Sequence, residues 1–352
     1  MNDLMKTTAT GVNRRSFLQR AGLLGVAAAP LAGLLAGTGT ARAVNPAVIP
    51  ASDVAILKFL AAAELLECDL WEQYCELATG NRQFRNALRR IDVSLPDYIC
   101  GDFEDECSHA NFINAYLVSI GEQAVNLDAF RTLPSSGATG AEQKGRLTNL
   151  TRLTVDTSYY NRYRGAGNPD FGDTFPQVVT ITNRPTIPTS NRVSERQMNL
   201  IAQSAAFHFG AIEQGGSSLY NSLSTKVTNL EVLAILASIG PTEFYHFAVF
   251  QTSLEGIYQL RSGDGLDFPN LRRNPARGAV MPKPCKFLNA SLPLCSVMRP
   301  RSTANAGAVA AATGLLTSGL FGVPGQPGGQ SQAFIDAAVG LATAADAATR
   351  LL

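Results

Sequence analysis

Histidine, tryptophan and charged residues are all scarce in this 352-residue chain. It has three histidines and one tryptophan, and charged residues make up 16% of the total. The formal net charge is +1, and no basic patch stands out, so the sequence predicts no nucleic-acid partner. After residue 43 we see no apolar run that reaches the length of a membrane span. The remaining chain of roughly 300 residues can bury a large core.

The first 43 residues have the pattern of an export signal. Arg14 and Arg15 are followed by apolar residues, as in a twin-arginine signal, and an Ala/Gly/Leu-rich stretch comes next. The sequence Ala41-Arg42-Ala43 fits a small-x-small cleavage site, with Val44 as the new N-terminus. We therefore expect residues 1–43 to be removed by export, with the twin-arginine translocation machinery as a partner and a periplasmic or extracellular location.

The six cysteines are spaced as pairs. Cys68 and Cys75 are seven residues apart, as are Cys100 and Cys107, so each pair shares one helical face. In two antiparallel helices, facing positions have a constant sum of residue numbers. Pairing Cys68 with Cys107 and Cys75 with Cys100 gives a sum of 175 in both cases. Such bonds suit an oxidising compartment, although free buried thiols are the alternative. The sequence predicts the disulfides Cys68–Cys107 and Cys75–Cys100, and a local bond Cys285–Cys295.

Four long segments have the apolar spacing of amphipathic helices. Antiparallel packing of the first two follows from the cysteine register. We expect an all-α fold in which these helices form one bundle over residues 44–262. The predicted helices cover residues 53–79, 98–121, 194–222 and 228–260.

The segments between and after these helices are irregular in composition. Residues 81–96 are polar, and residues 131–190 form a long connection with a short strand expected at 177–182. Pro241 lies inside the fourth helix and is expected to kink or split it. Residues 263–352 form a C-terminal extension that is first Pro-rich and then Ala/Gly-rich, in which we identify no chemistry.

Two of the three histidines follow a glutamate by three residues, in Glu106-Cys-Ser-His109 and Glu243-Phe-Tyr-His246. With only 13 glutamates in the chain, this coincidence is improbable. Residues three apart lie on one helical face, so each pair can bind one metal ion. Two such motifs, with one glutamate from each of two further helices, build a dinuclear centre in a four-helix bundle.

The two remaining glutamates come from an internal similarity between the first and third helices. The segment from Glu64 to Trp71 aligns with the segment from Glu213 to Tyr220, so Glu64 corresponds to Glu213. Glu67 remains an alternative to Glu64, because the cysteine register places it closer in level to Glu106 and His109.

Four carboxylates and two imidazoles suit two Fe or two Mn ions, whereas zinc more often takes four ligands with fewer carboxylates. The third histidine, His208, is expected to pack or to lie behind the ligands. Tyr220 and Tyr245 are nearby hydroxyls for which packing is the preferred role. The predicted metal ligands are Glu64, Glu106, His109, Glu213, Glu243 and His246.

The same segments resemble those of a known family. Residues 105–112 are similar to the second helix of bacterial ferritin-like proteins related to the desiccation-associated group. The stretches around Glu64–Glu67, Glu213–Asn221 and Thr242–His246 resemble their first, third and fourth helices. The resemblance implies a ferritin-like bundle with a long crossover connection, and it carries the family's ligand pattern to every expected position.

Two classes of function are compatible with this pattern. The first is redox chemistry with oxygen or peroxide at a di-iron or di-manganese centre, as in a ferroxidase, an oxidase or a catalase-like enzyme. The second is a non-catalytic stress- or envelope-associated protein with a structural or vestigial metal. A homo-oligomer is compatible with either, but the length of the chain disfavours a ferritin storage shell.

Overall fold

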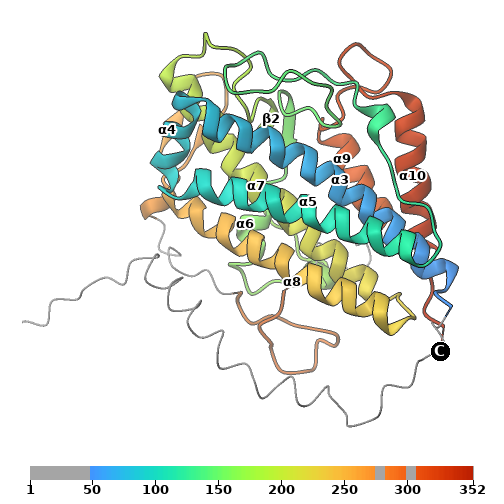
Figure 1. The fold of residues 1–352 in the computed structure, drawn as a ribbon. Helices are drawn as coiled ribbons and strands as arrows, with labels where there is room; N and C mark the ends of the chain where they lie inside the picture. The colour runs from blue at the N-terminus through green and yellow to red at the C-terminus, as the bar shows by residue number, and fades with distance from the viewer. Residues whose placement is uncertain (1–47, 274–281, 299–306, 352) are drawn as a thin grey trace, which may run out of the picture. The chain divides into compact units, whose positions relative to one another are not determined.

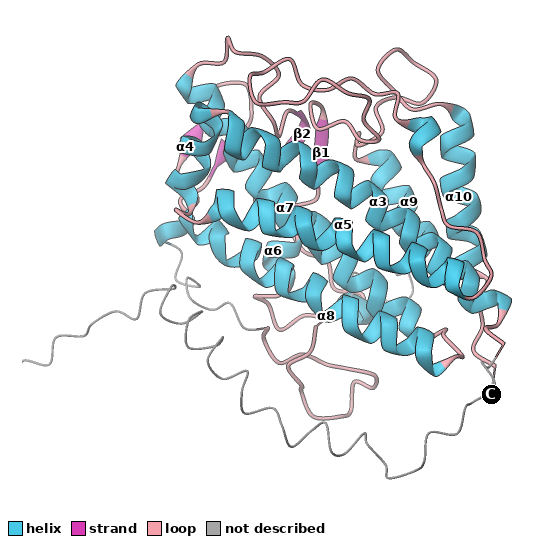
Figure 2. Ribbon diagram, viewed as in Figure 1, coloured by secondary structure: helices cyan, strands magenta, loops and turns pink. Residues whose placement is uncertain are grey.

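Four long helices run side by side in this computed structural model, which describes residues 48–273, 282–298 and 307–351 (Figure 1). Residues 49–352 form one unit. The export signal expected at residues 1–43 lies outside the described residues. Eight α-helices and a few short strands make the described chain predominantly helical, in agreement with the predicted all-α class (Figure 2).

The long helices form two antiparallel hairpins. Helix α3 packs against α5, α7 packs against α8, and α5 joins the hairpins by contacting α8. Each helix begins and ends within a few residues of the predicted bounds, except that α8 ends seven residues early. The four helices are α3 (Ala51–Gly80), α5 (Leu95–Ser119), α7 (Glu195–Ser224) and α8 (Leu230–Ser253).

Polar residues define where the second hairpin begins and turns. Ser194 accepts a hydrogen bond from the N–H of Gln197, which completes a capping box at the start of α7. The side chain of Asn229 caps α8. Asp53, buried in the first turn of α3, accepts hydrogen bonds from the backbone N–H groups of Thr228 and Asn229. The α7–α8 turn is thereby tied to the start of α3.

Two disulfides join α3 to α5, and the predicted pairing is confirmed. Cys68–Cys107 and Cys75–Cys100 each have a Cα–Cα distance of 4.8 Å. The predicted third bond is wrong, because the remaining two cysteines are free thiols. Their backbones pair across a β-bridge, but one side chain is buried beside Asn168 and the other is exposed. These two free cysteines are Cys285 and Cys295.

Helix α4 (Arg82–Ile91) occupies a segment that the sequence analysis treated as a polar linker. Its apolar residues Phe84, Ala87, Leu88 and Ile91 are buried and recur at helical spacing. They pack α4 against α7. Because this segment is rich in arginine, the helical spacing of its apolar residues was not recognised from the sequence.

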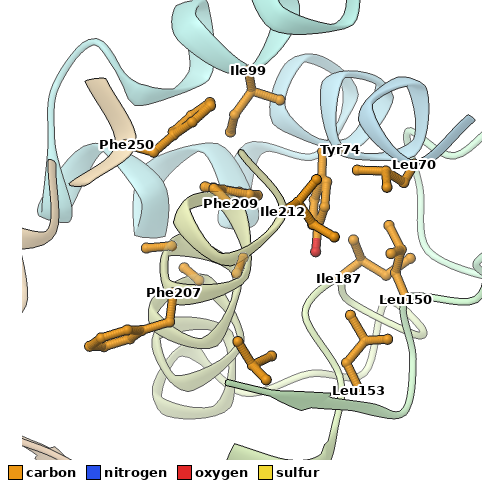
Figure 3. Packing of buried hydrophobic residues seen from close by; sticks show 14 of the residues in the cluster. Leu70, Tyr74, Ile99, Leu150, Leu153, Ile187, Phe207, Phe209, Ile212 and Phe250 are labelled. Atoms are coloured by element: carbon orange, nitrogen blue, oxygen red, sulfur yellow. The ribbon is translucent and has the colours of Figure 1, made fainter. Parts of the chain in front are cut away.

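Helix α8 is continuous through Pro241, so the predicted split does not occur. The helix with its following turn is apolar enough to span a membrane by length and composition, contrary to the sequence analysis. Its buried side chains pack within the bundle: Phe250 contacts Phe209 of α7 with 5.2 Å between ring centres, and Phe209 contacts Tyr74 of α3 at 4.7 Å (Figure 3). The apolar character of α8 is that of a core helix.

The β-strands of the long connection and the helices α9 and α10 of the C-terminal extension pack along the α3 and α7 side of the bundle (Figure 1). Strands β1 (Leu153–Val155) and β2 (Ile181–Arg184) form an antiparallel pair, with β2 later than the strand predicted at 177–182. Helix α10 packs on α3, and α9 packs on α10 and α7. The remaining elements are α6 (Tyr159–Arg162), α9 (Ala308–Thr317), α10 (Gln332–Asp346), β3 (Leu260–Arg261), β4 (Asp267–Phe268) and short 3₁₀ turns at Asp128–Phe130, Pro169–Phe171, Leu254–Gly256 and Leu271–Arg273.

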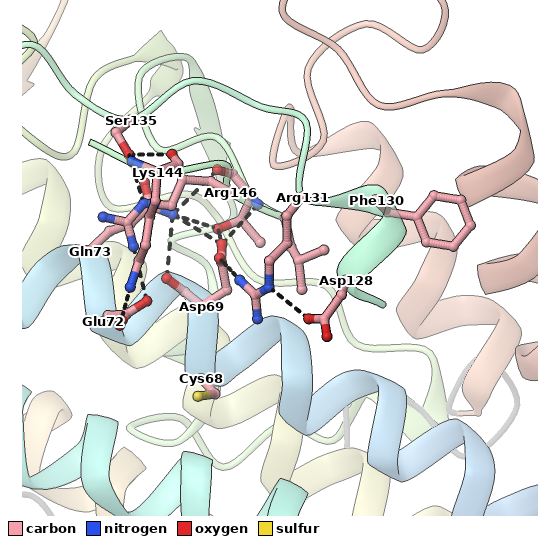
Figure 4. A network of polar contacts seen from close by, with 12 residues as sticks. Cys68, Asp69, Glu72, Gln73, Asp128, Phe130, Arg131, Ser135, Lys144 and Arg146 are labelled. Carbon is pink, nitrogen blue, oxygen red and sulfur yellow. Dashed lines mark hydrogen bonds and ion pairs between the residues drawn. The ribbon is translucent and has the colours of Figure 1, made fainter. Parts of the chain in front are cut away.

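A polar network attaches the start of the connection to α3 (Figure 4). Buried Asp69 accepts hydrogen bonds from Arg131 at 2.7 Å and from the Thr148 N–H at 2.9 Å. Arg146, whose side chain is fully buried, pairs with Glu72 at 3.0 Å. Since these charges are compensated within the chain, the network has a structural role.

Candidate metal centre

Six predicted ligands from all four long helices meet inside the bundle. Each hairpin contributes one helix with a single glutamate and one helix with a Glu-x-x-His motif. All six side chains are buried. They are Glu64 on α3, Glu106 and His109 on α5, Glu213 on α7, and Glu243 and His246 on α8.

The first half of the centre surrounds His109. Its Nδ1 atom lies 3.2 Å from a carboxylate oxygen of Glu106, 3.3 Å from Glu243 and 3.4 Å from Glu64. One atom from each of these four residues falls within a group whose members are all within 4.8 Å of one another. Three carboxylates and one imidazole therefore converge on one small volume.

The second half surrounds His246 in the same manner. Its Nδ1 atom lies 2.7 Å from Asp102, 3.0 Å from Glu106 and 3.3 Å from Glu213. Glu106 belongs to both halves, so one carboxylate reaches both positions. The two imidazole rings lie 6.3 Å apart between centroids. The arrangement is that of two adjacent cation positions joined by a shared carboxylate.

Asp102 was missed in the sequence analysis. It precedes Glu106 by four residues and His109 by seven, so all three lie on one face of α5. That spacing was a usable signal. With Asp102, five carboxylates and two imidazoles surround the two positions, and their negative charge slightly exceeds that of two divalent ions.

The donor atoms fit metal ions because many have no hydrogen-bond donor. Both carboxylate oxygens of Asp102 and of Glu243 are buried without a hydrogen bond, as is one oxygen each of Glu64, Glu106 and Glu213. Unpartnered buried charge costs several kcal/mol, of the order of 3–5, when nothing compensates it. Carboxylates that face one another with no donor between them need either protons or cations.

The pKa values of the site reflect the same crowding of buried carboxylates. Burial and the neighbouring carboxylate of Glu64 raise the pKa of Glu243 to about 7. Burial, followed by nearby carboxylates, also raises the pKa of Glu106 and Glu213. Burial alone lowers the pKa of His109, but the carboxylates of Glu106, Glu243 and Glu64 beside its Nδ1 atom outweigh this and raise the pKa to about 12. In the absence of metal, the site therefore retains protons.

Three further side chains hold the ligands in place. Asp105 lies 3.0 Å from Nε2 of His246, so it can accept that N–H and leave Nδ1 facing the centre. The Tyr220 hydroxyl donates a hydrogen bond to Glu64. Trp71 donates its indole N–H to Glu213 at 3.0 Å. Asp105 and Trp71 were not identified from the sequence, whereas Tyr220 was expected nearby.

The other residues considered from the sequence lie outside the two groups. Glu67 does not belong to either group, although its buried Oε2 has no hydrogen-bond partner. Burial, followed by the four glutamates of the centre, raises its pKa. His208 is buried 2.8 Å from the Tyr74 hydroxyl, and burial lowers its pKa to about 3. Tyr245 is exposed on the surface. Of the two helix α3 candidates, Glu64 has the position of a ligand.

A family model for the ferritin-like domain matches residues 52–256, which is more than half of the chain. The chain belongs to the ferritin-like domain family. No curated protein and no solved structure matches it. The matched range of the ferritin-like domain contains all four ligand helices and the long connection, and it ends at the turn after α8. Helices α9 and α10 lie beyond it.

Proposed function

We propose that this ferritin-like protein binds two Fe or two Mn ions and carries out redox chemistry with oxygen or peroxide outside the cytoplasm. The observation that carries the proposal is the pair of buried donor groups that share Glu106. Each group joins one imidazole to three carboxylates. Such a carboxylate-rich ligand set is typical of Fe and Mn sites, whereas structural zinc sites have fewer carboxylates. When bound, such ions supply reversible electron transfer to an oxygen species.

The protein's residues contribute position, charge and a water-poor environment. Asp105 orients His246, and the hydrogen bonds from Tyr220 and Trp71 restrict the rotation of Glu64 and Glu213. The buried carboxylates offset the charge of the ions. Without metal, the raised pKa of Glu243 lets it hold a proton near neutral pH, and this proton is released when an ion binds.

Two disulfides indicate an oxidising compartment, which supports an exported protein. We retain the twin-arginine signal at residues 1–43, the translocation machinery as partner, and the desiccation-associated group as parts of this proposal. A homo-oligomer is compatible with this proposal, and a purely structural metal is the alternative that the following experiment distinguishes from it.

The test is metal analysis of purified protein produced with Fe or Mn supplied, followed by assays of Fe(II) oxidation and peroxide consumption. We expect about two ions per chain, and a marked loss of metal in Glu106→Ala. Glu104→Ala provides a matched control, because this glutamate is exposed on the same helix. Absence of bound metal, with no change in thermal stability on adding either ion, would refute the proposal. Two bound ions with neither activity would support the structural role.

A further inference from the structure

A large cavity lies between the ligand helices and the C-terminal extension. Its volume is about 940 Å³, near the upper end of the range for small-molecule sites. Residues of α3 and α7 form its inner wall, and β1, β2, α9 and α10 form the outer wall. The long connection and the extension, for which the sequence suggested no role, thus border a partly open space against the bundle.

Two consecutive glycines of α7 lie in the inner wall. A Cβ atom at Gly216 would approach an oxygen of Glu243 to 2.2 Å, so any larger residue there would require the carboxylate of Glu243 to move. A Cβ atom at Gly215 would meet nothing within 4 Å, because that position faces open space. Each glycine costs a helix about 0.5–1 kcal/mol relative to alanine. Of the pair, Gly216 lies against Glu243, and Gly215 lines the cavity at an exposed position.

Glu67 is the second point at which the cavity meets the centre. It lines the cavity, and its charge acts on that of Glu64, Glu106, Glu213 and Glu243. It is therefore a side chain between the cavity and the ligands. The cavity borders the metal centre over a boundary made by Glu67 and Gly216.

The chemistry of the wall favours an uncharged occupant. Carbon atoms make up most of the lining. The buried cation there, Arg162, donates to Gln214 at 2.9 Å and lies 4.0 Å from Asp156. Its charge is thus met within the protein. The unpartnered Oε2 of Glu67 offers one polar contact in the wall. Elsewhere a charged ligand would lose its hydration against a mainly apolar wall.

We propose that the cavity binds an uncharged, mainly apolar organic molecule and holds it against the Glu67–Gly216 boundary of the metal centre. This inference rests on the proposed function, since it assigns the substrate class of the same site. The size of the cavity accommodates a compound of two or three fused rings or a medium-length alkyl chain.

The test titrates the full chain with 1-aminoanthracene, an uncharged probe whose fluorescence increases in apolar surroundings. We expect saturable binding at one probe per chain and displacement by 1-octanol. Gly215→Leu projects a side chain into the cavity and should weaken binding at least tenfold. Gly101→Leu is the matched control, because Gly101 is an exposed helical glycine with nothing within 4 Å of its Cβ position.

A second variant guards against misfolding of the first. Ala311→Phe fills the cavity from α9 on the outer wall, and it should weaken binding similarly. Metal content is measured in parallel and should be unchanged in Gly215→Leu. Wild-type protein without saturable binding, or equal affinity in both filled variants and the control, would overturn the inference. Probe binding to a protein that takes up no metal would instead refute the proposed function and leave the cavity as a binding site.

Discussion

Metal binding should reverse the direction in which pH changes the stability of this protein. In the metal-free state, burial and the charge of Glu64 raise the pKa of Glu243 from 4.5 to about 7. Between these values the unfolded chain releases a proton that the folded chain retains. The stability that the protonated Glu243 contributes is fully present below pH 4.5 and is lost as the pH rises through 7. At about 1.4 kcal/mol per pKa unit, Glu243 alone lowers the free energy of unfolding by about 3 kcal/mol.

Bound metal changes the sign because the ligands must lose their protons to bind it. The folded, loaded protein then holds fewer protons than the unfolded chain in the acidic range. Its stability falls as the pH falls, because protons compete with the ions for the carboxylates. His109 strengthens the contrast, since its pKa of about 12 without metal means that it too must release a proton on binding.

The assay is urea unfolding followed by circular dichroism between pH 5 and pH 8, with a chelator or with Mn(II). The variant Glu243→Gln has no proton to exchange at this position. Between pH 5 and pH 8, its metal-free free energy of unfolding should therefore fall by about 3 kcal/mol less than that of the wild type. Glu104→Gln, on the exposed face of α5, should behave as wild type. Metal-free stability that rises from pH 5 to pH 7, or the same slope with and without metal, would contradict the reasoning.

Three other changes test separate parts of the structure. Asp102→Asn should weaken one of the two ions by about 10–100-fold in a calorimetric titration, and two unchanged affinities would remove Asp102 from the site. Gly216→Ala places a Cβ atom 2.2 Å from an oxygen of Glu243, so metal content should fall while the helical circular dichroism remains. Cys68→Ser should lower the free energy of unfolding by about 3–4 kcal/mol, because the bond to Cys107 closes a loop of 39 residues. Unchanged urea midpoints would show that this disulfide contributes nothing.

The grouping of the candidate ligands was predictable because it depends on short-range helical geometry. A spacing of three residues places Glu106 beside His109 in any helix, and the same holds for Glu243 and His246. The cysteine register was predictable for a related reason, since seven-residue spacing repeats on one face and antiparallel packing determines the partners. These features require no knowledge of the loops.

Features that depend on packing between distant segments were harder to predict. The spacing of Asp102 placed it on the face of Glu106 and His109, but its contact with the centre depends on α8, which places His246 2.7 Å away. Cys285 and Cys295 are adjacent along a β-bridge, but the burial of the Cys285 thiol involves Asn168, which lies more than a hundred residues away. The cavity depends on where α9 and α10 dock, which no local pattern in their Ala/Gly-rich sequences specifies.

Trp71 gives the protein a built-in optical probe. It is the only tryptophan in the chain, and its indole N–H is bonded to Glu213. Unpaired electrons of Fe or Mn ions quench excited indole rings at short range, so all tryptophan emission comes from a ring one hydrogen bond away from a ligand. Loading of this half of the centre can therefore be followed in real time on unlabelled protein.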